Sequence, residues 1–179
     1  MKKTVLTFGI ISGLVVALLM TLSILLFYGE EDMSGSMMVG YASMLIAFAF
    51  IFVGIKNYRD KYNGGVVTFG KALQIGLLIA FIASSFYVAA WLVEYYCFMP
   101  DFMDKYADHV LKQMQESGAT ASEIAAQKEH LDFGREAYKT PIGIILMTYV
   151  EILPLGIVIA LICALILKRK SIGNREISG

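Results

Sequence analysis

Cysteine is scarce in this 179-residue chain, which has only two. Two thiols cannot form a disulfide-rich scaffold or a four-thiolate zinc site. A surplus of basic charge is also lacking, because fifteen Lys and Arg residues balance fifteen Asp and Glu residues. This balance excludes the strongly basic surface of a general nucleic-acid-binding protein, so we expect no nucleic-acid partner.

Charged residues of either sign are few. They make up 17% of the chain, whereas 58% of the residues are hydrophobic and the mean hydropathy is +0.66. Such a composition is too apolar for an ordinary soluble domain. The sequence therefore predicts an integral membrane protein, whose first partner is the lipid bilayer.

The hydrophobic residues fall into four blocks. A helix needs roughly 20 residues to cross about 30 Å of hydrocarbon, and these blocks are long apolar runs rather than the alternating pattern of membrane strands. We predict an all-α fold, in which residues 1–179 form a single membrane domain built as a four-helix bundle. The predicted transmembrane helices cover residues 4–28, 37–55, 69–99 and 141–167.

Basic residues are distributed unevenly between the predicted loops. Ten Lys and Arg residues fall on the side that carries the two termini, whereas the other side has five, all within residues 100–140. Basic residues accumulate on the cytoplasmic side of membrane proteins. We therefore predict that both termini are cytoplasmic and that residues 100–140 lie outside.

Residues 100–140 have the pattern of an amphipathic helical hairpin. Apolar residues recur at helical spacing from Phe102 onward, and Ser117-Gly118 provides a stop because Gly accepts the left-handed conformation at a helix end. Thr120-Ala-Ser-Glu123 matches a capping box, and Pro141 begins the last membrane helix. We predict an extracytoplasmic hairpin between the third and fourth membrane helices, either over the mouth of the bundle or on the membrane surface.

Two carboxyl groups interrupt the apolar helices. Glu151 lies about ten residues into the fourth predicted helix, roughly 15 Å deep, and Glu94 lies about one turn from the outer end of the third. A charge at the depth of Glu151 costs at least a few kcal/mol on insertion scales. We predict that Glu151 faces the bundle interior.

These carboxyl groups define a candidate intramembrane polar site, which also includes the nearby Tyr87 and Tyr149. Two interpretations remain open. The site responds to protons or cations between the third and fourth helices, or the two acids have a structural role, in which Glu151 bonds across helices and Glu94 reaches water.

No pattern of catalytic or metal-binding residues is present. His109 and His130 fall in separate predicted helices, and no H-x-x-x-H or H-E-x-x-H motif occurs. No Ser/His/Asp or Cys/His set is expected to converge within the membrane. We therefore predict no catalytic residues, no metal and no cofactor, and we do not expect an enzyme.

A family resemblance rests on the predicted inner loop and the start of the third predicted helix. The segments Gly54-Ile-Lys-Asn-Tyr-Arg-Asp60 and Gly64-Gly-Val-Val-Thr-Phe-Gly-Lys-Ala72, followed by Gly76, resemble an uncharacterised bacterial family, domain of unknown function 4199. The resemblance covers nearly the whole chain, including four spans and a polar segment before the last. It implies a bacterial cytoplasmic (inner) membrane protein typical of Bacteroidota, and it implies no activity.

The favoured function is that of a non-enzymatic membrane or envelope interaction or scaffold protein, with a protein partner at the outer hairpin or a second copy of the chain. The alternative is a small transport or ion- or proton-responsive protein that uses Glu151 and Glu94. A transporter would need a polar path on both sides of Glu151, whereas an interaction protein needs only an exposed patch on the hairpin.

Overall fold

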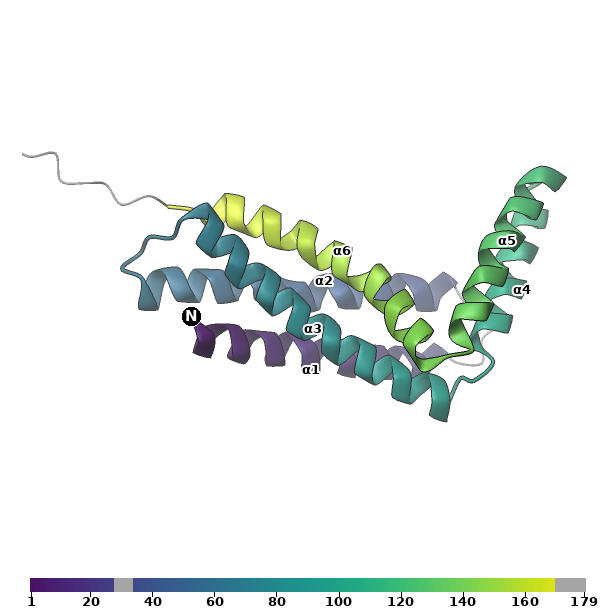
Figure 1. Ribbon diagram of the computed structural model, residues 1–179, viewed down its shortest axis with the longest axis horizontal. Coiled ribbons are helices and arrows are strands. Elements are labelled where there is room, and N and C mark those ends of the chain that lie inside the picture. The colour runs from purple at the N-terminus through teal and green to yellow at the C-terminus, as the bar shows by residue number, and fades with distance from the viewer. Residues whose placement is uncertain (28–33, 170–179) are drawn as a thin grey trace, which may run out of the picture.

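The computed structural model describes residues 1–27 and 34–169, and these are almost entirely helical. No β-strand occurs among them, apart from an isolated bridge between Val67 and Arg169. Four long helices run along one another, and two shorter helices form a hairpin at one end of the bundle (Figure 1). The elements in chain order are α1 (Lys2–Phe27), α2 (Ser34–Asn57), the π-helical turn η1 (Tyr58–Tyr62), α3 (Phe69–Cys97), α4 (Phe102–Glu116), α5 (Ala121–Tyr138) and α6 (Pro141–Leu167).

The four long helices α1, α2, α3 and α6 are long and apolar enough to cross a membrane. The predicted all-α class with four membrane helices is therefore confirmed. Helix α6 occupies the predicted range 141–167, whereas α2 begins three residues before its predicted start. Helix α2 ends at Asn57, two residues past its predicted end, and η1 follows directly. The predicted end of the first helix at Tyr28 lies outside the described residues.

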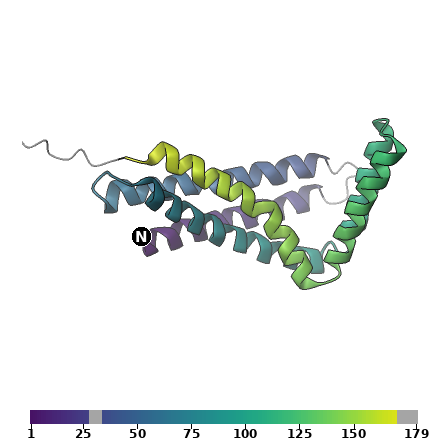
Figure 2. The ribbon, with the colours of Figure 1, turned by 45° about the horizontal axis from the view of Figure 1, so that its top comes forward.

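Helix α3 occupies the centre of the bundle. It packs along α1 on one side and along α6 on the other, and α2 lies against all three. Figures 1 and 2 show the four helices side by side from two directions. The fully buried side chains that fill the centre come mainly from α2 and α3, and include Phe48, Ile51, Ile75 and Ile79.

Small residues bring the helix backbones close together. A Cβ atom on Gly13 of α1 would lie 2.6 Å from the ring of Phe86 on α3, and one on Gly76 of α3 would lie 3.0 Å from Ala160 on α6. Close approach of this kind is a main source of helix association where lipid is as apolar as the side chains. Gly40 is an exception, because no described atom lies within 4 Å of a Cβ built there.

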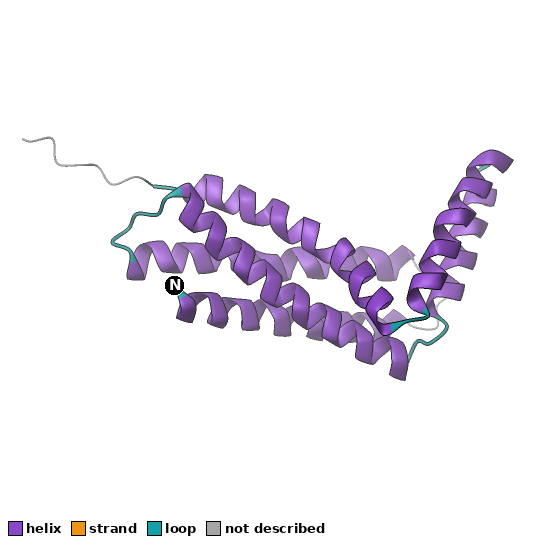
Figure 3. Ribbon diagram, viewed as in Figure 1, coloured by secondary structure: helices purple, strands orange, loops and turns teal. Residues whose placement is uncertain are grey.

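The two ends of the bundle differ. The N-terminus and the end of α6 lie together at one end, here called the terminal end, and the hairpin lies at the other, the hairpin end (Figure 1). Figure 3 shows the described loops at these two ends. At the terminal end Val67 and Arg169 exchange backbone hydrogen bonds of 3.0 and 2.8 Å, and Arg59 donates to the carbonyl of Leu167 at 3.4 Å. These bonds fasten the α2–α3 connection to the end of α6.

Helices α4 and α5 pack against each other, and α5 then contacts α6. The hairpin is steeply inclined to the bundle and crosses its end (Figures 1 and 2). Gly118 in the turn has a φ of +77°, as expected for the left-handed end of α4. Thr120 and Glu123 form the predicted capping box, and the Thr140 hydroxyl caps α6 ahead of Pro141.

Candidate functional site

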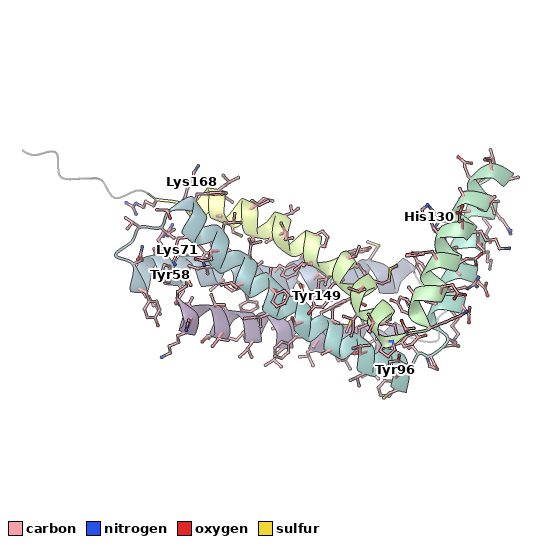
Figure 4. The ribbon with its side chains drawn as sticks, viewed as in Figure 1. Tyr58, Lys71, Tyr96, His130, Tyr149 and Lys168 are labelled. Atoms are coloured by element: carbon pink, nitrogen blue, oxygen red, sulfur yellow. The ribbon has the colours of Figure 1, made fainter. Side chains whose placement is uncertain are left out.

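The four residues of the predicted polar site do not converge on one cavity. Glu94 faces α1, Tyr149 faces α3 from α6, and Glu151 is exposed on α6. Figure 4 shows Tyr149 midway along the bundle and Tyr96 near the hairpin end. Tyr87 lies buried in the core, within electrostatic range of both acids.

Glu94 is the most buried acid of the described chain, with 4% of its surface exposed. The hydroxyl of Thr21 on α1 donates a hydrogen bond of 2.6 Å to its Oε1 atom. Its Oε2 atom is buried and has no hydrogen-bond partner among the described residues. No basic side chain of the described chain forms an ion pair with it. The structural interpretation, in which Glu94 reaches water, does not fit a side chain that is this deeply buried.

The Thr21 hydroxyl is shared between two acceptors. It lies 3.0 Å from the carbonyl oxygen of Ala17 and 2.6 Å from Glu94. A hydroxyl has a single proton and donates one hydrogen bond at a time, so Glu94 has at most one donor, and only part of the time. Sequence reasoning missed Thr21, because a lone Thr in an apolar helix ordinarily bonds the carbonyl four residues before it.

A groove of about 180 Å³ opens beside this carboxyl group. Thr21 and Glu94 supply its polar lining, and Ile24, Leu25 and Phe98 supply its apolar lining. The groove lies between the last turns of α1 and α3, at the hairpin end of the bundle. It combines one buried carboxyl group with an otherwise apolar surface.

Glu151 does not face the interior, and that prediction is wrong. The buried residues of α6 recur every four positions at Ile144, Thr148, Ile152 and Gly156. A row of this spacing winds slowly around a helix of 3.6 residues per turn. At the depth of Glu151, Thr148 and Ile152 occupy the inward face, so the carboxyl group lies beside that face and is exposed.

The surroundings of Glu151 are nevertheless rich in phenol groups. Tyr41 of α2, Tyr87 of α3 and Tyr138 of α5 all lie within electrostatic range of its carboxyl group.

Tyr149 forms a separate contact between α6 and α3. Its hydroxyl donates to the Ser85 hydroxyl at 2.8 Å, and Ser85 in turn donates to the carbonyl of Phe81 at 2.8 Å. The rings of Phe81 and Tyr149 stack with their centroids 6.1 Å apart. All the polar atoms of this contact have partners, which is typical of a structural hydrogen bond between membrane helices.

An aromatic cluster joins the bundle to the hairpin. Trp91 of α3 meets Phe102 of α4 edge to face at 4.8 Å, and its indole N–H donates to the Tyr138 hydroxyl at 3.3 Å. Tyr95 also meets Tyr138 edge to face, at 5.4 Å. Burial raises the pKa of the Tyr138 phenol, which therefore stays neutral and available for hydrogen bonding.

An ionic cluster holds the two hairpin helices together. Arg135 of α5 lies 3.0 Å from Asp104 and 3.6 Å from Asp108, both on α4. It also contacts Asp132 of its own helix at 3.4 Å. Asp101 stands at the N-cap of α4, but its side chain pairs with Lys105 and makes no capping bond.

The histidines do not form a metal site in the described residues, where no group of three or more His, Cys, Asp or Glu side chains is placed to hold an ion. His109 is half-buried on α4 and His130 is exposed on α5. Figure 4 shows His130 partway along the hairpin.

A model of the family described as "Protein of unknown function (DUF4199)" matches residues 7–169, from the first membrane helix to the end of the last. The chain belongs to this family. The match confirms the resemblance noted in the sequence. No curated protein and no solved structure matches the chain. Membership of the DUF4199 family carries no activity, so a function for this member has to be argued from its own residues.

Proposed function

We propose that this DUF4199 protein is a non-enzymatic membrane interaction protein, whose α4–α5 hairpin docks a basic protein partner outside the bilayer. On this proposal the chain lies in a bacterial inner membrane with both termini cytoplasmic. One observation carries the proposal. The hairpin is braced as a single unit and joined to the bundle, yet most of its surface remains exposed.

The bracing acts at both ends of the hairpin. Arg135 joins α5 to two aspartates of α4, and the Trp91–Phe102–Tyr138 cluster fixes the base to α3. At the far end, the turn between the helices is closed by the capping box of Thr120 and Glu123. A docking surface that is ordered before binding loses less conformational entropy when it binds.

The exposed surface of α5 has a defined chemistry. Phe133 is 68% exposed, and the exposed acids Glu129 and Glu136 lie one turn before and after it. Residues 101–140 contain eight acidic and five basic residues. A single exposed aromatic ring flanked by acids fits a partner segment that combines a basic residue on each side with an apolar pocket.

The same charge disfavours the membrane surface as the occupant. Anionic headgroups attract clusters of Lys and Arg and repel acidic segments. A hairpin with more acidic than basic residues is therefore better suited to a protein than to an anionic bilayer.

The experiment places a photo-crosslinking benzoylphenylalanine at position 133 of the full chain in its native membranes. We expect a discrete crosslinked protein product. The double variant Glu129→Lys/Glu136→Lys should abolish the product, because it repels a basic partner. Glu116→Lys makes the same kind of charge change at the far end of α4 and serves as the matched control.

Three outcomes would contradict the proposal. The first is labelling of lipid alone. The second is a product with twice the mass of this chain, which would mean that the hairpin meets a second copy. The third is a protein product that survives the double charge reversal as well as the control does.

A second candidate function, an ion- or proton-responsive protein, is favoured by the position of Tyr87. This buried phenol lies within electrostatic range of both Glu94 and Glu151, the two acids of the long apolar helices. Proton flux into liposomes that contain the protein, measured with an internal pH dye, tests it. Flux that is lost in both Glu94→Gln and Glu151→Gln supports this candidate, and no flux above that of empty liposomes contradicts it.

A further inference from the structure

The groove beside Glu94 has the features of a ligand site that the hairpin proposal does not use. It is lined by Thr21, Ile24, Leu25 and Phe98 together with the 4% exposed Glu94. The Oε2 atom of Glu94 is buried without a hydrogen-bond partner among the described residues. Buried polar atoms of folded proteins almost always have a partner, so an orphaned carboxylate oxygen beside a groove indicates a missing donor.

The kind of donor follows from what the site lacks, which is hydrogen-bond donors and a positive charge close to Glu94. A carboxylate accepts several hydrogen bonds, but Thr21 offers one proton that it shares with Ala17. No basic side chain of the described chain forms an ion pair with Glu94. An ammonium group would supply both a positive charge and three N–H donors.

The lining and position of the groove identify what carries the ammonium group. Leu25 is 72% exposed and Phe98 is 60% exposed, so the walls of the groove continue into the lipid-facing surface of the bundle. Glu94 lies one turn before the end of α3, close to the level where hydrocarbon gives way to headgroups. A small soluble amine would leave this apolar surface uncovered, whereas the acyl chains of a lipid would pack against it.

We propose that the groove between α1 and α3 binds the headgroup ammonium of an aminophospholipid, with phosphatidylethanolamine as the simplest member of the class. The ammonium donates to the carboxyl group of Glu94, and the acyl chains lie along Ile24 and Leu25. The volume of about 180 Å³ is well above what a single water needs. The proposal rests on Glu94 alone and is independent of the hairpin function.

Native mass spectrometry of the full chain tests this proposal. Delipidated protein in mild detergent is given equal amounts of phosphatidylethanolamine and phosphatidylcholine with identical acyl chains. The quaternary ammonium of phosphatidylcholine has a positive charge but no N–H. We expect the wild type to retain phosphatidylethanolamine about tenfold more than phosphatidylcholine, the effect of one charge-assisted hydrogen bond.

Two glutamine variants distinguish the site from general lipid binding. Glu94→Gln should bring the ratio close to one, whereas Glu151→Gln changes the other membrane acid and should leave the ratio as in the wild type. Leu25→Trp fills the groove without touching the carboxyl group, and should lower retention of phosphatidylethanolamine even if Glu94→Gln folds poorly. Equal retention of both lipids by the wild type would overturn the proposal, as would an unchanged ratio in Glu94→Gln.

Soluble ethanolamine separates the lipid from its headgroup. A large excess of ethanolamine should not displace bound phosphatidylethanolamine, because ethanolamine lacks the acyl chains that the apolar walls bind. Full displacement would show that the groove recognises a small amine, and the assignment to a lipid would be wrong.

Discussion

At the residue scale, a glycine in a membrane helix matters where another helix comes close to it. Gly13 and Gly40 lie in α1 and α2, both in helix interiors. A Cβ atom on Gly13 would lie 2.6 Å from Cγ of Phe86 and 2.7 Å from its Cβ atom, which cannot move without the backbone of α3. No described atom lies within 4 Å of a Cβ on Gly40.

We therefore expect Gly13→Ala to destabilise the bundle by about 1–3 kcal/mol, the usual cost of overpacking. Gly40→Ala should leave stability unchanged or raise it slightly, because alanine favours a helix over glycine. Thermal unfolding followed by circular dichroism in detergent compares the two. Equal melting temperatures for both variants would show that α1 and α3 are not in this close contact.

The two membrane acids show what sequence could and could not predict at this scale. Their presence, and the cost of placing them in apolar helices, could be derived from residue positions alone. Their orientation could not, because α3 and α6 are apolar on every side and carry no polar stripe that marks the outward face. Packing decides instead. Thr148 and Ile152 occupy the inward face of α6, which leaves Glu151 exposed. Glu94 lies against α1, where the Thr21 hydroxyl donates to it.

At the element scale, the start of α5 depends on a charged cap. Glu123 accepts hydrogen bonds from the backbone N–H and the hydroxyl of Thr120, and these bonds hold the pKa of its carboxyl group below the ordinary 4.5. Because the folded-state pKa is lower than the unfolded one, the stabilisation is present above pH 4.5. It is lost as the pH falls through the folded-state pKa.

Glu123→Gln should therefore weaken the first turn of α5 at pH 7, and this effect should shrink as the pH falls through the folded-state pKa of Glu123 in the wild type. Hydrogen–deuterium exchange of residues 121–126 measures this, comparing variant and wild type at the same pH so that intrinsic exchange rates cancel. Equal protection of the two proteins at pH 7 would mean that the carboxylate does not stabilise the cap.

The pairing of α4 with α5 depends on Arg135. Its side chain is 29% exposed and has three aspartate partners, whereas each partner is more than half exposed. Exposed ion pairs contribute about 0.2–1 kcal/mol each, so we expect Arg135→Gln to lower the free energy of opening the hairpin by about 1 kcal/mol.

Hydrogen–deuterium exchange of α4 should accelerate in Arg135→Gln, and the difference from wild type should shrink at high salt, which screens the ion pairs. Lys139→Gln is the control, since Lys139 follows the last residue of α5 and its ion pair is with Glu136 of that helix. Equal exchange of α4 in the two variants would show that Arg135 does not hold the hairpin helices together.

The helices themselves were largely predictable because their end signals are local. The capping box at Thr120, the left-handed Gly118 and Pro141 each fix a boundary through neighbouring backbone atoms. Asp101 shows the limit of such signals, because its carboxylate pairs with Lys105 instead of the helix N-terminus. Residue spacing alone does not show whether the Asp101 carboxylate bonds to the helix N-terminus or to Lys105, which lies one turn away.

At the scale of the whole molecule, the four long helices place the N-terminus and the end of α6 together at one end and the hairpin at the other (Figure 1). Hydropathy predicts the number of crossings. It does not predict that α3 is the central helix or that α1 and α6 lie on either side of it. That order depends on which small residues meet which neighbours, such as Gly76 with Ala160.

Cysteine accessibility tests this arrangement most directly. In a Cys97→Ser/Cys163→Ser background, Ser117→Cys introduces a thiol in the exposed hairpin turn and Asn63→Cys introduces one in the exposed loop at the terminal end. A membrane-impermeant maleimide is applied to intact cells and to permeabilised cells. We predict that the thiol at position 117 reacts in intact cells, and that the thiol at position 63 reacts only after permeabilisation. Reaction of both thiols from the same side would contradict a four-span bundle with the hairpin and the termini on opposite faces of the membrane.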